Sequence, residues 1–170
     1  MKHQIIKKFL DVDSFEKIKN IIISDTFPWY AQKGLTQNDD GQVLFTHILV
    51  DKRHQIASSA YEKIATPVLD KIQEIEPDFS RVLRMKINCY PNQTKVVKSD
   101  FHIDIPRGKH KVLIFNINNN NGCTEFKNPK IKFVFSTENS AFIFNGKEEH
   151  RSVSQTDTPY RWNININYEC

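Results

Sequence analysis

The sequence predicts an α+β fold that is mainly β, with helices in its first half and a barrel or jelly roll of strands in its second half. Two segments before residue 81 carry apolar residues at helical spacing. From Arg81 onward, apolar and polar residues alternate with a period of two, which is typical of strands with one buried face. These runs are short and separated by turns such as the Asn-rich stretch 118–122, which favours a barrel or jelly roll. We expect the helices to brace one outer face of the sheet.

A strand is predicted at residues 5–10, and the first helix follows it. Asp13 and Glu16 form a capping-box pattern at the start of this helix, which we expect to end near Ile23. The buried face of the helix would carry three apolar residues, Phe15, Ile18 and Ile22.

The remainder of the first half continues with a β-rich run at residues 42–50 and a helical pattern at residues 56–75. Pro67 interrupts the helical pattern. It either kinks one helix or begins a second helix after Thr66, because proline lacks the backbone N–H and is tolerated in a first turn.

The second half is predicted to consist of short strands joined by turns. The expected strands are residues 82–90, 101–105, 111–118, 130–135, 141–144 and 160–168.

Two of these strands each carry a polar face opposite an apolar one. Arg161, Asn163, Asn165 and Asn167 alternate with apolar residues in the last strand, and Arg84, Lys86, Asn88 and Tyr90 do so in the strand at 82–90. The commonest arrangement would turn the polar faces to solvent. The alternative is that the apolar faces pack on the helices and the polar faces line a ligand-holding interior, and the metal-ligand pattern described next favours it.

A metal-ligand pattern begins with His102-Ile103-Asp104 and continues with His150 and then Arg161. Residues i and i+2 of a strand point to the same side, so His102 and Asp104 could reach one metal ion together. Two histidines and one carboxylate are the set that holds non-haem Fe(II) and leaves open positions. A downstream arginine can pair with the carboxylate of a dicarboxylate co-substrate. The alternative is coincidence, because 6 His and 20 acidic residues make chance matches to His-x-Asp easy.

Length and composition bound the remaining possibilities. A chain of 170 residues with 39% hydrophobic and 26% charged residues fits one globular domain over residues 1–170, with helices and edge strands in 1–80 and the barrel in 81–170. Three cysteines without paired spacing and the lack of an apolar signal segment lead us to expect a cytoplasmic protein. No run is apolar enough for a membrane span, and a net charge of +4 does not by itself indicate nucleic acid.

A series of short segments has the order and spacing of a known enzyme family. The segments are 88–91 (NCYP), 101–104 (FHID), 112–116 (VLIFN), 122–126 (GCTEF), 142–145 (FIFN), 150–153 (HRSV) and 161–165 (RWNIN). Together the stretch 84–168 resembles the double-stranded β-helix core, a jelly-roll or cupin-like barrel, of the Fe(II)/2-oxoglutarate-dependent dioxygenases. It is most similar to the prolyl-hydroxylase-like branch and to short phage-encoded members, and residues 27–30 (FPWY) add to the phage-like character.

The resemblance implies a role for each matching residue. His102, Asp104 and His150 match the iron ligands, and Arg161 matches the residue that binds the distal carboxylate of 2-oxoglutarate. Three further residues match positions that line the co-substrate pocket, namely Tyr90, Asn88 and Thr124. The cofactors implied are Fe(II) and 2-oxoglutarate, with ascorbate as an optional reductant, and no catalytic residue beyond the metal ligands. The activity implied is hydroxylation of a C–H bond with O₂, giving succinate and CO₂.

The expected substrate is a peptide or protein residue such as proline, and other functions stay open. The chain could be a non-catalytic, cupin-like metal-binding module, or an oxygenase acting on a small molecule or a nucleic-acid base. Base-demethylating members resemble one another in carrying a second Arg on the last strand, where this chain has Asn167, so nucleic acid is disfavoured. The polar loop at residues 32–42 is a candidate substrate lid. The oligomeric state is not predicted.

Overall fold

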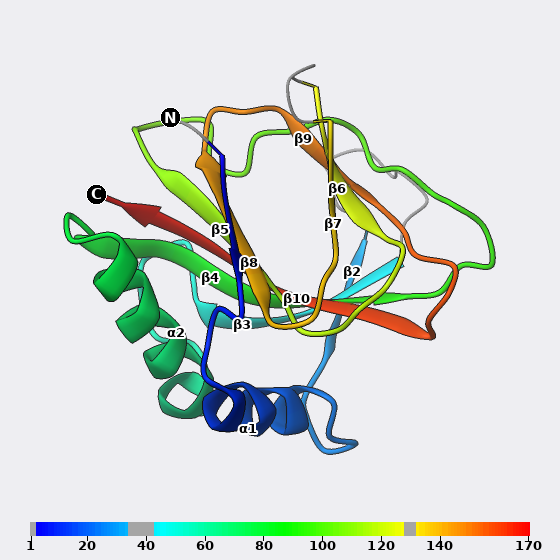
Figure 1. Ribbon diagram of the computed structural model, residues 1–170, viewed down its shortest axis with the longest axis horizontal. Coiled ribbons are helices and arrows are strands. Elements are labelled where there is room, and N and C mark those ends of the chain that lie inside the picture. Colours follow the sequence, from blue (N-terminus) through cyan, green and yellow to red (C-terminus); the bar gives the residue numbers. More distant parts are fainter. Residues whose placement is uncertain (1–2, 34–42, 128–131) are drawn as a thin grey trace.

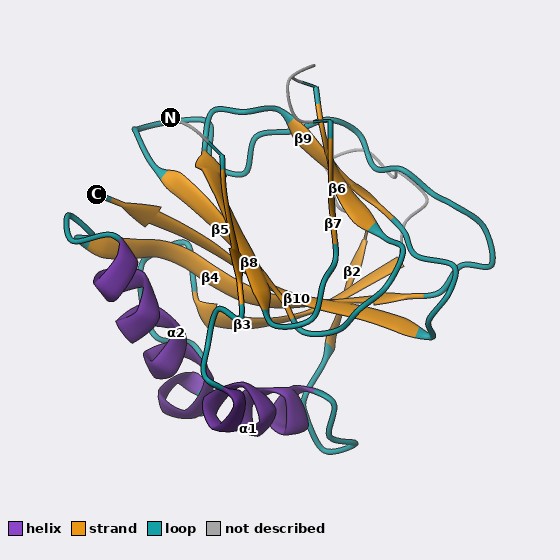
Figure 2. Ribbon diagram, in the orientation of Figure 1, coloured by secondary structure: helices purple, strands orange, loops and turns teal. Residues whose placement is uncertain are grey.

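The computed structural model describes residues 3–33, 43–127 and 132–170, which form two antiparallel sheets and two helices (Figures 1 and 2). The larger sheet has the strand order β1-β8-β5-β10-β4-β3-β2, and the smaller has the order β7-β6-β9. The strands are β1 (Gln4–Lys7), β2 (Tyr30–Lys33), β3 (Val43–Val50), β4 (Arg81–Pro91), β5 (Lys111–Asn116), β6 (Cys123–Phe126), β7 (Phe133–Phe135), β8 (Ser140–Asn145), β9 (His150–Val153) and β10 (Tyr160–Glu169). Both helices lie on one side of the larger sheet, and the smaller sheet lies on the other (Figure 1).

Helix α1 (Val12–Ile22) presents Phe15, Ile18 and Ile22 to the core, as predicted. Its N-cap is Asp11 rather than Asp13, because the Asp11 side chain accepts a hydrogen bond of 2.9 Å from the Ser14 backbone N–H. Asp13 lies in the first turn instead, where its negative charge suits the helix dipole.

Helix α2 (Tyr61–Ile75) begins five residues later than the pattern predicted. The predicted start at residue 56 is wrong because Ile56 forms an isolated β-bridge with Val50. Pro67 lies inside the helix, so the alternative of a second helix beginning there is also wrong. No helix in the described residues is long and apolar enough to cross a membrane.

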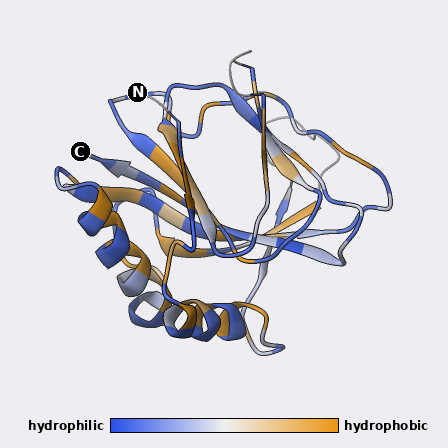
Figure 3. Ribbon diagram, in the orientation of Figure 1, coloured by the Kyte–Doolittle hydropathy of each residue, from blue (hydrophilic) through white to orange (hydrophobic). Residues whose placement is uncertain are grey.

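The main hydrophobic core lies between the helices and the larger sheet. In Figure 3 both helices carry hydrophobic and hydrophilic residues, as expected for helices with one buried face. The apolar faces of the central strands β4 and β10 enter this core through Met85, Ile87, Ile164 and Ile166, which are fully buried. The predicted bracing of one sheet face by the helices is therefore confirmed, and the opposite faces of β4 and β10 are left for the interior between the sheets.

Several strands differ from the prediction. Residues 101–105 are not a strand, because only an isolated bridge between His102 and His150 joins this segment to β9, and Pro106 cannot donate to a ladder. Strand β1 ends at Lys7, before the positive φ of Lys8. Strands β2, β6 and β9 were not predicted. Of the predicted strand at 130–135, residues 133–135 form β7, and residues 130 and 131 lie outside the described part.

His110 is buried, with 5% of its surface exposed. Its ring lies against Gly146, where a Cβ would come within 2.1 Å of the His110 Nε2 atom. We therefore expect Gly146→Ala to destabilise the fold by about 1–3 kcal/mol through overpacking. Urea unfolding measures this free-energy change.

The double variant His110→Ala/Gly146→Ala separates this clash from other effects. Removing the imidazole should abolish most of the penalty of the Gly146 substitution, giving a coupling of about 1 kcal/mol or more between the two sites. Additive effects of the two substitutions would contradict the packing described here.

Candidate metal centre

A cavity of about 780 Å³ lies between the two sheets. The polar faces of β4 and β10 form much of its wall, through Arg84, Lys86, Asn88, Tyr90, Arg161, Asn163 and Asn165. The two strands are neighbours, with Tyr90 opposite Arg161 and Lys86 opposite Asn165. The prediction that these polar faces line an interior space is confirmed.

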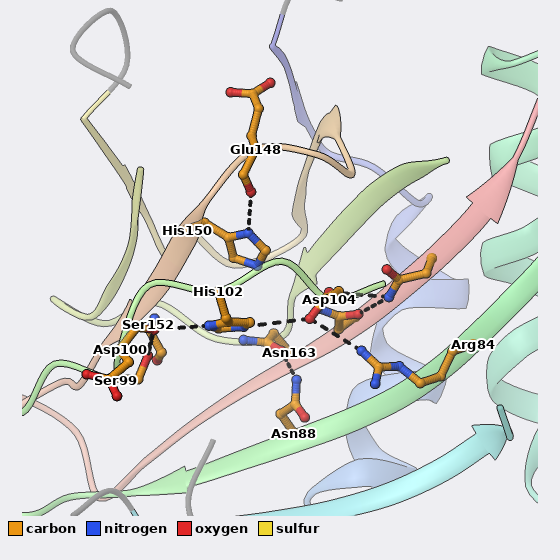
Figure 4. A network of polar contacts seen from close by, with 12 residues as sticks. Arg84, Asn88, Ser99, Asp100, His102, Asp104, Glu148, His150, Ser152 and Asn163 are labelled. Atoms are coloured by element: carbon orange, nitrogen blue, oxygen red, sulfur yellow. Dashed lines mark hydrogen bonds and ion pairs between the residues drawn. The ribbon is translucent and has the colours of Figure 1, made fainter. Parts of the chain in front are cut away.

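His102, Asp104 and His150 meet at this cavity (Figure 4). One side-chain ligand atom from each lies within 4.8 Å of the other two. His150 is the first residue of β9, and backbone hydrogen bonds in both directions pair it with His102. The β-bridge thus places one histidine beside the other, although the segment that carries His102 and Asp104 is not a regular strand.

Both histidines are oriented by hydrogen bonds to backbone carbonyls. The Nδ1 atom of His102 donates to the carbonyl oxygen of Asp100 at 3.1 Å, and that of His150 donates to the carbonyl of Glu148 at 3.0 Å. A carbonyl can only accept, so the proton lies on Nδ1 in each ring. The lone pair of each Nε2 atom is then free for a metal ion, which is the arrangement that such outer partners produce at metal sites.

The Asp104 carboxylate is held from three directions. The side-chain amides of Asn165 and Asn167 donate to its Oδ2 atom at 2.9 and 3.3 Å, and the Arg84 Nη2 atom lies 3.3 Å from Oδ1. The Nε2 atom of His102 is 3.7 Å from the same Oδ1, too far for a hydrogen bond but close enough for both atoms to share one ion.

The charges of the cluster keep Asp104 ionised. Burial would raise the pKa of its carboxyl, but His102, His150, Arg84 and Lys86 hold that pKa well below its usual value. Burial lowers the pKa of His150, which favours the neutral imidazole that a metal requires. For His102, burial acts in the same direction, but the neighbouring Asp104 and the Asp100 carbonyl outweigh it and raise the pKa.

Arg161 lies deeper in the cavity and is almost fully buried, with 2% exposed. Its Nη1 atom donates to the carbonyl of Val153 at 2.7 Å, and the guanidinium stacks over the Tyr90 ring, 4.7 Å from its centroid. Its Nε atom has no hydrogen-bond partner, and no acidic side chain among the described residues pairs with it. A buried guanidinium without a counter-ion is costly, so this end of the cavity is suited to an anion.

The other predicted pocket residues also line the cavity. Tyr90 is buried, and burial raises the pKa of its hydroxyl. Asn88 donates to the Asn163 side chain at 2.9 Å, while its own Oδ1 atom has no partner. Thr124 lies on β6 in the opposite wall. These positions are compatible with contact to a co-substrate, and the roles assigned to them stay predictions.

Sequence reasoning gave no role to the side chains that hold Asp104. Arg84, Asn165 and Asn167 were placed on polar strand faces, and that period of two was the only signal pointing to them. The candidate lid at residues 32–42 lies almost wholly outside the described residues, which include only its first two positions.

Replacing Asn165 by Leu tests whether the carboxylate must be held in place. The change removes the shortest of the hydrogen bonds to Asp104 while keeping a side chain of similar size. Loss of an outer partner typically costs about 10–100-fold in metal affinity, and we expect a loss in that range for Fe(II), measured by anaerobic titration. The matched variant Asn118→Leu, at a half-exposed position outside the cavity, should bind Fe(II) as the wild type does. Equal affinities for the two variants would contradict this role.

No protein-family model and no curated protein matches the sequence, but known structures match its fold. A prolyl hydroxylase from Trichoplax adhaerens, in complex with a peptide fragment of the hypoxia inducible factor oxygen degradation domain, has a TM-score of 0.71 at 14% identity, over 98% of this chain and 82% of that one. A Pseudomonas putida prolyl-4-hydroxylase has a TM-score of 0.67 at 10% identity, over 98% and 91%. The epimerase SnoN in complex with Fe³⁺, alpha ketoglutarate and nogalamycin RO has a TM-score of 0.65 at 11% identity, over 98% and 78%.

These likenesses show the fold. The chain has the double-stranded β-helix of the 2-oxoglutarate/Fe(II) oxygenases, which confirms the predicted fold class. At identities of 10–14%, the chemistry of this chain has to be argued from its own residues.

Proposed function

We propose that this protein is an Fe(II)- and 2-oxoglutarate-dependent oxygenase that hydroxylates a C–H bond of a peptide or protein residue such as proline. The observation that carries the proposal is the buried Arg161, whose guanidinium has no acidic partner among the described residues and lies in the same cavity as the His102, Asp104 and His150 cluster. One cavity thus holds a set of metal-ligating side chains and, apart from them, a site for an anion. This arrangement fits a co-substrate that carries an anionic group at the end away from the metal.

The donor set fits iron. Two imidazoles whose Nδ1 atoms donate to backbone carbonyls, which leaves Nε2 for a metal ion, and one ionised carboxylate are the ligands of the facial triad, which leaves positions for other molecules on the metal. Bound Fe(II), with 2-oxoglutarate and O₂, would supply oxidative decarboxylation to succinate and CO₂ coupled to hydroxylation, with ascorbate as a reductant. Asp104 supports this assignment over halogenation, because halogenating members of the superfamily lack the carboxylate.

The protein residues would bind and orient the reactants. Arg161 would hold the distal carboxylate of 2-oxoglutarate, and the Tyr90 ring beneath it fixes the guanidinium. Asn88 and Thr124 would offer hydrogen bonds along the walls between that carboxylate and the metal. The burial of Arg161 and His150 keeps bulk water from these groups, which strengthens their interactions with charged ligands.

The peptide part of the proposal rests on fold-level analogy. The similar prolyl hydroxylase from Trichoplax adhaerens was solved with a peptide fragment, and we extend that substrate class to this chain. The alternative of a metal-binding module without catalysis predicts no turnover of 2-oxoglutarate, and so one assay distinguishes the two.

That assay measures succinate formed from 2-oxoglutarate under air with Fe(II) and ascorbate, with and without a pool of proline-containing peptides. Wild-type protein should form succinate, the peptide pool should raise the rate, and His102→Ala should remove the activity. Wild type and His102→Ala that are equally inactive, or a rate independent of Fe(II), would refute the proposal.

A further inference from the structure

The wall of the cavity beside Asp104 carries more positive charge than is needed to bind iron and 2-oxoglutarate. Arg84 and Lys86 lie on one face of β4, and Lys52 lies just after β3. Asp100 and Asp104 are the acidic residues among those that line the described cavity. Arg161 is assigned to 2-oxoglutarate and Arg151 is paired with Glu125, so three cations, Lys52, Arg84 and Lys86, remain near the Asp104 carboxylate.

Asp104 is already fully engaged. Arg84 contacts its Oδ1 atom, the amides of Asn165 and Asn167 donate to its Oδ2 atom, and the same carboxylate is the proposed iron ligand. The Arg84 Nε atom is buried without a hydrogen-bond partner, so this guanidinium has donor capacity left over. Asp104 therefore cannot also serve as the counter-ion of Lys86.

Lys86 is a cavity cation without a partner. It is half-buried, and within the described part of the chain no hydrogen bond or ion pair holds its ammonium group. Burial, and then the like charges of Arg84 and Lys52, lower its pKa to about 8, although Asp104 acts in the opposite direction. An anion beside Lys86 would relieve both the desolvation and the repulsion.

We propose that the substrate carries an anionic group close to the C–H bond that is hydroxylated, and that Lys86, with Lys52 at the rim, binds this group. This inference rests on the proposed function and names the class of substrate: an acidic or phosphorylated peptide. A single side chain can enter the cavity and reach the half-buried Lys86, whereas a nucleic-acid backbone would require cations on an open surface. The exposed Lys52 would meet the anion at the entrance.

Peptide binding tests the inference without turnover. Fluorescent decapeptides of Gly and Ser with one central Pro would carry Glu, phosphoserine, Gln or Lys on both sides of the proline. Fluorescence anisotropy would measure their affinities for protein loaded with Zn(II) and 2-oxoglutarate, and for metal-free protein. The variants are Lys86→Glu and, as a control with the same change in net charge, Lys63→Glu on the exposed face of α2.

Wild type and Lys63→Glu should bind the Glu or phosphoserine peptide roughly tenfold more tightly than the Gln peptide, as expected for one charge-assisted contact. Lys86→Glu should lose this preference and favour the Lys peptide. Comparing the affinities of the Glu and phosphoserine peptides shows whether the site prefers a carboxylate or a phosphate.

Equal affinity of wild type for the Glu, phosphoserine and Gln peptides would overturn the inference. An unchanged preference in Lys86→Glu would also overturn it, as would an oligothymidine that binds the cavity more tightly than every peptide. Failure of wild type to bind Fe(II) and 2-oxoglutarate would instead contradict the proposed function, and the peptide comparison on metal-free protein would still decide whether Lys86 selects anions.

Discussion

Replacing Arg161 by Gln is expected to weaken the binding of 2-oxoglutarate by about 100-fold or more while leaving Fe(II) affinity within about threefold of wild type. The guanidinium is buried and has no acidic partner within the described residues, so the co-substrate carboxylate would be its counter-ion in a site shielded from water. Loss of one member of a buried charge pair typically costs about 2–5 kcal/mol, which corresponds to roughly 30-fold to a few thousandfold in affinity, and the near-complete burial of Arg161 favours the upper part of that range. Anaerobic titration of the Fe(II)-loaded protein with 2-oxoglutarate measures the effect.

Two control variants sharpen the Arg161 experiment. Arg161→Lys keeps the charge but loses the planar two-point contact, so its affinity for 2-oxoglutarate should fall between those of wild type and Arg161→Gln. Arg151→Gln removes another cation of the cavity, but Arg151 is paired with Glu125 at 2.9 Å and should matter little for the co-substrate. Equal losses of 2-oxoglutarate affinity in Arg151→Gln and Arg161→Gln would mean that binding depends only on the overall charge of the cavity.

Replacing His150 by Gln is expected to lower Fe(II) affinity by at least about 100-fold and to remove 2-oxoglutarate turnover. Changes to outer partners alone cost about 10–100-fold, and loss of a ligand should cost more. Gln is chosen because His150 is buried against Phe126 and Phe144, where a smaller residue would leave a void. Metal content after anaerobic loading and desalting measures the change.

The control for His150 is His54→Asn, an exposed histidine outside the cavity. His54 has a φ of 65°, a conformation that Asn tolerates, so the control should keep its fold and its iron. Iron retained by His150→Gln at wild-type affinity would show that the three residues do not form a metal site.

Local patterns predicted the elements that bury one face. Phe15, Ile18 and Ile22 follow helical spacing and are buried on α1, and the alternation along β10 separates its core face from its cavity face. The order of His102, Asp104, His150 and Arg161 likewise singled out four residues that the fold brings to one cavity. The helix and strand patterns are read from neighbours along the chain, whereas the four site residues were singled out by their order and by the resemblance to a known family.

Features that depend on distant residues were not predictable in this way. Residues 101–105 alternate like a strand, but the segment finds only one bridge to β9. His110 is buried because Gly146, the residue after β8, leaves room for its ring. The hydrogen bond between Asn165 and Asp104 joins residues 61 positions apart, so no local sequence pattern indicates it.

The most direct test of the proposed iron and co-substrate site is an anaerobic titration of the protein with Fe(II) followed by 2-oxoglutarate, monitored by visible absorption. Chelation of the metal by the co-substrate should give a weak charge-transfer band that saturates at one Fe(II) and one 2-oxoglutarate per chain. The band should be absent in His102→Ala, and Arg161→Gln should require a much higher 2-oxoglutarate concentration to reach it. A wild-type protein that binds Fe(II) without developing this band, or a band unchanged in His102→Ala, would contradict the proposed site.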